Sequence, residues 1–366
     1  MLHRNPLLDE NMGGKKFITV GEIMLRLTPP NYEKIRMATS FEASYGGSEA
    51  NIALALANLG VDSTFFSVVP NNSLGKSAVR MLRSNDVHCT PMILSTPEET
   101  PSHRLGTYYL ENGYGIRASK VIYDRKHSAF AEYDFSTVDL DALLADFDWL
   151  HVSGITPALG SSCRELVMNL LKAAQHHGLT VSFDGNFRSS LWSWEEARDF
   201  CTECLPYVNI LLGIEPYHLW RDENDHSKGD CKDGVPMQPS YEQQDEIFQA
   251  FIRRYPNLRC IARHVRYVHS GSENSLKAFM WYEGHTFESK LYTFTILDRV
   301  GGGDAFASGL IYAMLHDYRP MDIAMTGVNF AVASSVLKHT IHGDANITDD
   351  VQGIRNLMSL NYDIKR

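Results

Sequence analysis

Little in this sequence points to a membrane, a secreted scaffold or a nucleic-acid surface. No apolar run reaches the roughly 20 residues that cross a bilayer, and residues 1–16 are polar and charged, unlike a signal peptide. The net charge of -10 and the pI near 5.8 disfavour a protein that holds nucleic acid through its phosphates. We therefore expect a cytoplasmic protein that binds neither membranes nor nucleic acids.

Cysteine is also scarce, with 6 residues in a chain of 366, which favours reduced thiols over a disulfide framework. Cys201 and Cys204 form a C-x-x-C pair inside a predicted helix, Trp194 to Leu205, with no second pair nearby. Helix packing is therefore favoured over a metal or redox site for these two thiols.

Two common nucleotide motifs are missing. No G-x-G-x-x-G follows the first predicted strand, which disfavours a dinucleotide-dependent oxidoreductase. Gly75-Lys76-Ser77 looks like the end of a P-loop, but Pro70 stands where that motif needs a glycine. Any nucleotide site must therefore come from another pattern.

Glycine is concentrated just before a predicted helix at Gly301-Gly302-Gly303-Asp304. Glycines let the backbone approach a ligand closely, and the free amide groups at a helix N-terminus bind anions. Asp304 is placed to accept a proton from a substrate hydroxyl. The simpler alternative is a tight strand-to-helix turn in which Asp304 only favours the helix N-terminus.

A second glycine pair, Gly46-Gly47, leads into a helix of small residues that Gly60 ends. Backbone donors again face a space of ligand size. Asn51 in the first turns of this helix offers an acceptor and donors to sugar hydroxyls.

Strand and helix patterns alternate through the middle of the chain, for example strands at Trp149 to Ser153 and Thr180 to Asp184 around a helix at Arg164 to Ala174. This order predicts an α/β fold with a doubly wound, mostly parallel sheet flanked by helices. Ligand sites in such sheets lie beyond the carboxyl ends of strands. Asp184 and Arg188 follow a strand and are expected at such a site.

The remaining segments are assigned by their patterns. We expect residues 1–16 to be a tail, 17–366 to be one catalytic domain, and Phe17 to Leu27 to be its first strand. Segments near 30–45 and 103–125 are predicted to form a small β flap, and the stretch near 221–240 is predicted to be a surface insertion.

Three motifs in register, Gly46-Gly47-x-x-x-Asn51, Asp184-x-Asn186-x-Arg188 and Gly301 to Asp304, resemble those of the ribokinase-like (PfkB) carbohydrate kinases over roughly residues 17 to 360. Tyr123 to Lys126, Asp298-Arg299-Val300 and His342-Gly343-Asp344 look most like the members that phosphorylate 2-keto-3-deoxygluconate.

The resemblance implies phosphoryl transfer from ATP, with Mg²⁺, to a small sugar acid. Asp304 would be the general base, and the amides of Gly301, Gly302 and Gly303 would form the anion hole. The implied substrate-binding residues are Gly46, Gly47, Asn51, Tyr109, Tyr123, Arg125, Asp184 and Arg188. The two arginines suit a carboxylate, although Arg188 is also placed to pair with Asp184 and the tyrosines to pack within the flap. A homo-oligomer is implied by the family alone.

The pattern departs from the family where the nucleotide binds. The usual Asn-x-x-Glu is replaced by Gly213-Ile214-Glu215, and the usual Gly-x-Gly by Ser270-Gly271-Ser272. Expected nucleotide contacts are therefore limited to Glu215, Ser270, Gly271 and Asn346, with no protein ligand assigned to the metal.

Two alternatives stay open at the sequence level. One is a kinase of a neutral sugar such as fructose, which has no carboxylate for Arg125 and Arg188 to bind. The other is a sugar-acid sensor that keeps the fold without catalysis, although the intact Gly301 to Asp304 motif disfavours it. The choice between ketodeoxygluconate and its C4 epimer depends on the partner of one hydroxyl group.

Overall fold

The computed structural model describes residues 14–217, 231–232, 235–236, 238–315, 320–347 and 350–360. Residues 1–13 of the expected tail and most of the expected insertion near 221–240 lie outside these described residues. Within that stretch, β12 (Cys231–Lys232) pairs antiparallel with β13 (Val235–Pro236). None of the described helices is long and apolar enough to cross a membrane.

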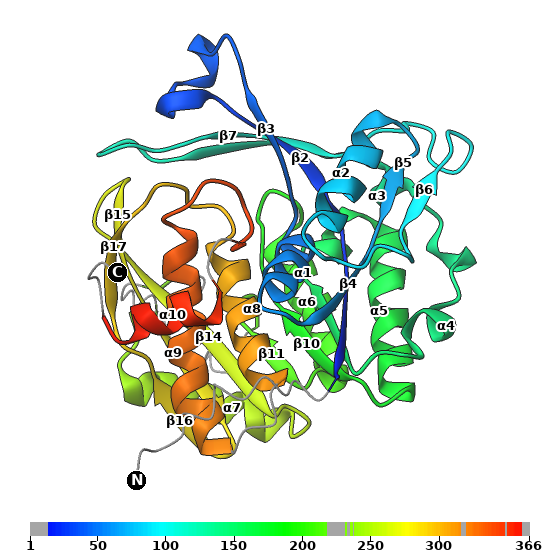
Figure 1. The fold of residues 1–366 in the computed structure, drawn as a ribbon. Helices are drawn as coiled ribbons and strands as arrows, with labels where there is room; N and C mark the ends of the chain where they lie inside the picture. The colour runs from blue at the N-terminus through cyan, green and yellow to red at the C-terminus, as the bar shows by residue number, and fades with distance from the viewer. Residues whose placement is uncertain are drawn as a thin grey trace.

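A nine-stranded sheet forms the centre of the molecule (Figure 1). Its strands are β1 (Lys16–Val20), β4 (Asp62–Phe66), β9 (Trp149–Ser153), β10 (Thr180–Asp184), β11 (Ile210–Leu212), β14 (Cys260–Val268), β15 (Glu273–Tyr282), β16 (His285–Glu288) and β17 (Tyr292–Thr295). The run β14-β11-β10-β9-β1-β4 is parallel throughout. The last three strands extend one edge in antiparallel pairs. The expected mostly parallel sheet is confirmed.

Helices cover both faces of this sheet. On one face, α5 (Ser161–His176), α6 (Trp194–Cys204) and α7 (Tyr241–Arg254) pack against alternate strand residues such as Leu211. On the other face, Ile210 and Leu212, the chain neighbours of Leu211, share a core with four helices. These are α1 (Ser48–Asn58), α8 (Gly302–Leu315), α9 (Pro320–Lys338) and α10 (Val351–Met358). The alternation follows from the two-residue period of a strand.

A second sheet, which we call the flap, lies apart from the main sheet at the top of Figure 1. Its strands in order are β3 (Glu42–Gly46), β2 (Met24–Thr28), β7 (Thr107–Glu111) and β8 (Lys120–Asp124). The expectation of one strand from Phe17 to Leu27 is therefore wrong beyond Val20. At Gly21 a Cβ atom would lie 2.4 Å from the Glu49 carboxyl, so the chain passes closely over α1 before entering the flap.

Smaller elements complete the fold. They are β5 (Val68–Pro70), β6 (Ile93–Ser95), α2 (Ser73–Arg83), α3 (Ala129–Glu132) and α4 (Leu140–Leu144). Gly75 lies inside α2, whose first turn is capped by the side chain of Asn72, so this stretch is an ordinary helix start and not a P-loop. Cys201 and Cys204 are buried and unpaired in the core, in keeping with helix packing.

Candidate active site

A cavity of about 610 Å³ opens between the flap and the carboxyl ends of β10 and β11. The first turns of α1 and α8 form part of its wall, so segments distant in sequence converge on it. Of the catalytic, substrate-binding and nucleotide-binding residues expected from the sequence, those in its lining are Gly47, Asn51, Tyr123, Arg125, Asp184, Arg188, Glu215, Gly301, Gly302, Gly303 and Asp304.

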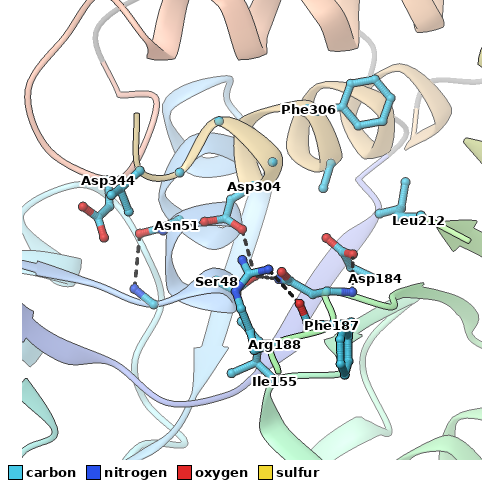
Figure 2. Close-up of a pocket in the computed structure, with 18 of the residues that line it drawn as sticks. Ser48, Asn51, Ile155, Asp184, Phe187, Arg188, Leu212, Asp304, Phe306 and Asp344 are labelled. Atoms are coloured by element: carbon cyan, nitrogen blue, oxygen red, sulfur yellow. Dashed lines mark hydrogen bonds between the residues drawn. The ribbon is translucent and has the colours of Figure 1, made fainter. Parts of the chain in front are cut away.

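Asp304 lies in the first turn of α8 with both carboxylate oxygens held. Ser48 Oγ donates a hydrogen bond to Oδ1 at 2.8 Å, and Asn51 Nδ2 donates to Oδ2 at 2.6 Å (Figure 2). Burial raises the pKa of Asp304, while these two hydrogen bonds lower it. The carboxylate is therefore fixed in direction and more basic than an exposed aspartate.

The three glycines before Asp304 bring the main chain to the cavity surface. Gly301 has φ +83°, and a Cβ atom there would lie 1.7 Å from the carbonyl oxygen of Asp344. A Cβ atom at Gly302 would lie 2.3 Å from the His339 ring. Since the first amide groups of a helix have no intrahelical acceptor, these glycines present donors at the positive end of α8.

Asp184 ends β10 and accepts a hydrogen bond from the Asn186 amide at 3.0 Å. Asn186 Nδ2 donates to Ser48 Oγ at 2.9 Å, so Asn186 and Ser48 form a relay to Asp304. Burial, followed by the charge of Asp304, raises the pKa of Asp184 to about 7. The site thus concentrates negative charge on this side of the cavity.

Arg188 faces the same space as Asp304 and Asp184 in Figure 2. Its Nη1 donates to the carbonyl oxygen of Phe187 at 3.2 Å, and no ion pair joins it to Asp184. The guanidinium group therefore remains available to an anionic ligand.

The family is established by comparison. Residues 15–216 match the model of the pfkB family of carbohydrate kinases. This chain belongs to that family. It is 32% identical over 338 residues to a 2-dehydro-3-deoxygalactonokinase of Haloferax volcanii, covering 92% of this chain and 94% of that protein.

Solved structures agree with the family assignment. The 2-dehydro-3-deoxygluconokinase of Thermotoga maritima has 35% identity and a TM-score of 0.82, covering 94% of this chain and 99% of that one. A PfkB family carbohydrate kinase of Listeria grayi has 34% identity and a TM-score of 0.82, covering 94% and 100%. The α/β architecture of this kinase is therefore that of its family.

The structure gives several expected residues of the kinase a role different from a sugar contact. The side-chain amide of Asn51 donates a hydrogen bond to Asp304 and so orients that carboxylate. Gly46 does not line the cavity. It packs against Asp344, because a Cβ atom placed on Gly46 would lie 2.2 Å from Asp344 Oδ2. Gly47 does line the cavity. Only glycine fits at this position, because a Cβ atom there would lie 2.1 Å from the Glu22 carbonyl oxygen.

Arg125 is buried and already paired. Its Nε donates to Glu22 Oε2 at 2.8 Å, and Nη2 contacts the same oxygen. The charge that Arg125 offers to a substrate is therefore partly neutralised, in contrast to Arg188. Tyr123 lies beside it, 5.9 Å from the guanidinium carbon to the ring centroid.

The adjacent tyrosines of β7 point to opposite faces of the flap. Tyr108 pairs with Tyr123 across the strands and both line the cavity. Tyr109, expected at the sugar, instead packs on Phe41 at 6.0 Å between ring centroids. The structure therefore does not bring Tyr109 to the cavity and brings Tyr108 in its place, since successive strand side chains alternate.

Of the expected nucleotide contacts, only Glu215 lines the cavity, with Arg263 Nη2 at 3.7 Å from its carboxylate. Gly271 donates its amide to the Gly115 carbonyl at 2.7 Å, so the turn containing Ser270 and Gly271 packs on the flap. Asn346 is buried and donates to Ser334 Oγ at 3.0 Å. The structure does not bring Ser270, Gly271 or Asn346 to the cavity.

A buried ionic network behind the glycines was missed by sequence reasoning. Arg26 of β2 pairs with both Asp298 and Asp344, and the Tyr108 hydroxyl donates to Asp344. The network joins two flap strands to the segment that positions Gly301. The available signal was a lone arginine within the apolar stretch Met24 to Leu27, which requires an anionic partner when buried.

Proposed function

We propose that this carbohydrate kinase transfers the γ-phosphoryl group of ATP to the primary hydroxyl of a 2-keto-3-deoxy sugar acid, giving the 6-phosphate and ADP. The observation that carries the proposal is the fixed Asp304 carboxylate at the glycine-led start of α8, in one cavity with Arg188, which forms no ion pair with a described residue. The similar proteins from H. volcanii and T. maritima are named for the galacto and gluco forms of such acids, respectively.

Asp304 acts as the general base in this mechanism. As the substrate oxygen forms its bond to phosphorus and the bond to the ADP oxygen breaks, the hydroxyl proton moves to Asp304. Its raised pKa strengthens it as a base, and Ser48 and Asn51 keep it aimed at the substrate. The Gly301 to Gly303 amides stabilise charge on the transferring phosphoryl group, an effect of about 3–4 kcal/mol for a key donor in other enzymes.

Arg188 is the residue best placed to bind the substrate carboxylate. A guanidinium group binds a carboxylate through two parallel hydrogen bonds, which requires a group free of other anions. Arg188 forms no ion pair with a described residue, although its charge acts on Asp184 and Asp304, while Arg125 is engaged with Glu22. We infer that Arg125 mainly shapes the flap side of the cavity.

The cavity has a donor set that fits Mg²⁺, the ion that accompanies ATP. Asp184 and Glu215 both line it and offer the oxygen ligands that Mg²⁺ takes. Burial and the charge of Asp304 raise the pKa of Asp184, and a cation beside it would favour its ionised form. When bound, the ion neutralises charge on the phosphate oxygens.

The flap excludes water from the reaction. Tyr108 and Tyr123 form its inner surface, and water beside ATP would compete with the sugar hydroxyl. The division into tail, catalytic domain, flap and insertion, a homo-oligomer and a cytoplasmic location stay predictions from the sequence.

The proposal is tested by coupled ADP release from the purified protein with Mg-ATP. The substrates are 2-keto-3-deoxygluconate, its C4 epimer, fructose, ribose and no sugar. We expect turnover on one or both keto-deoxy acids and at most traces on the neutral sugars. Turnover on fructose or ribose alone would replace the substrate. Binding of a keto-deoxy acid without turnover would indicate a sensor.

A further inference from the structure

Three arginines line the cavity without a carboxylate partner in the described part of the chain. Of the cavity arginines, Arg125 pairs with Glu22 and Arg263 with Glu215, whereas Arg188, Arg266 and Arg299 form no ion pair with a described residue. The Nε atoms of Arg266 and Arg299 are buried and have no hydrogen-bond partner among the described residues. Arg266 and Arg299 are partly buried, and their Nε groups lack the hydrogen bonds that burial of a polar group requires.

Two fully buried arginines, Arg26 and Arg125, show how such burial is compensated. Arg26 contacts two carboxylates, and Arg125 contacts one. Removal of a guanidinium group from water is costly unless an anion is beside it. The missing anion at Arg266 and Arg299 is therefore expected to come from a ligand.

The three arginines also repel one another. Burial, followed by the charges of Arg299 and Arg188, lowers the pKa of Arg266 to about 10. Burial lowers the pKa of Arg299 as well. The charge of Arg266 is thus opposed by two neighbouring arginines and, among the described residues, paired with no carboxylate.

This cluster lies at the N-terminus of α8. Arg299 stands two residues before Gly301. Arg266 is on β14, two residues after His264, whose ring is 3.9 Å from a Cβ atom placed at Gly303. The cluster therefore adds to the positive field of the helix terminus, next to the amides that face the reacting phosphoryl group.

We propose that Arg266 and Arg299 bind the phosphate chain of the nucleotide donor. Several linked phosphates match a group of guanidinium ions and a helix N-terminus better than one carboxylate does, and planar guanidinium groups bind phosphate oxygens in pairs. The proposal rests on the proposed function in that the cavity takes a triphosphate donor. It assigns the nucleotide side of the cavity to Arg266 and Arg299, which line it, in place of Ser270 and Gly271, which do not.

The test is calorimetric binding of inorganic tripolyphosphate, which carries the phosphate chain without nucleoside and needs no turnover. Arg266→Gln and Arg299→Gln are each expected to weaken binding of tripolyphosphate and of ATP by about tenfold or more, the loss of one charge-assisted pair. Binding of the keto-deoxy acid is expected to change by less than about twofold. Arg253→Gln, which removes an exposed charge at the end of α7, is the matched control and should leave all three affinities unchanged.

Loss of sugar-acid affinity with donor affinity intact would overturn the proposal and make the cluster a carboxylate site. Unchanged affinity for every ligand would overturn it as well. Should a glutamine variant fail to fold, Arg266→Lys and Arg299→Lys keep the charge and lose the planar fork, and an intermediate loss of tripolyphosphate affinity is expected. A wild type that binds tripolyphosphate through these arginines but phosphorylates no keto-deoxy acid would remove the proposed substrate and leave this inference standing.

Discussion

Below about pH 7, Asp184 keeps a proton that an exposed aspartate would release. Burial and the charge of Asp304 raise its pKa from 3.8 in a free chain to about 7. The folded protein therefore holds a proton between these values that the unfolded chain has released. This contribution to stability is fully present below pH 3.8 and is lost as pH rises through about 7.

We predict that Asp184→Asn stabilises the protein more at pH 8 than at pH 5, because pH 5 lies only part of the way between the two pKa values of Asp184. Asparagine keeps an acceptor for the Asn186 amide and carries no charge. Without Mg²⁺, the melting temperature should rise by about 1–2 °C at pH 8 for each ~1 kcal/mol gained, given an unfolding entropy of ~2.1 cal/mol/K per residue. Equal shifts at the two pH values would show that the charge of Asp184 has no part in them.

The two arginines expected at the substrate differ in their partners, and their variants should differ in kind. Arg188→Ala removes an unpaired cation, so we predict a KM for the sugar acid raised about tenfold or more, with a melting temperature close to that of the wild type. Arg125→Ala leaves the buried Glu22 carboxylate alone and should lower the melting temperature. An unchanged KM in Arg188→Ala would remove it from carboxylate binding.

At the scale of elements, Arg26 of the flap strand β2 pairs with Asp298, just before α8, and with Asp344, just after α9. Arg26→Met leaves Asp298 and Asp344 buried without their cation, and we predict a loss of about 3–5 kcal/mol in the free energy of unfolding by urea. The control is Arg104→Met, which breaks an exposed flap ion pair with Asp124 and should cost about 0–1 kcal/mol. Similar losses in the two variants would contradict the structural role of the network.

Element boundaries followed closely from sequence where local pattern decides them. The strand at Trp149 to Ser153 and the helix from Trp194 were both predicted at their observed starts, since apolar periodicity and a Ser193 cap are local signals. The break at Gly21 was missed because the apolar run continues into β2. Only the contact of Gly21 with Glu49 on α1 shows that the chain changes sheets there.

At the scale of the whole molecule, the motifs predicted which segments meet but not which side chain each contributes. Asp304, Asp184 and Gly47 follow from glycine and strand-end patterns and do line one cavity. Tyr108 could not be chosen over Tyr109 without knowing which face of β7 turns inward. Arg26 and Arg266 could not be assigned either, because their surroundings come from segments remote in the chain.

The fold brings Ser48 and Asn51 of α1 next to Asp304 of α8, about 250 positions away in the sequence. Both donate hydrogen bonds to its carboxylate. The most direct test of this account is the turnover of Asp304→Asn with Mg-ATP and the keto-deoxy acid, alongside calorimetric binding of that acid. We predict a kcat lower by at least about 100-fold, with the dissociation constant of the acid nearly unchanged. Near-normal turnover in this variant would remove Asp304 as the base and contradict the mechanism proposed for the site.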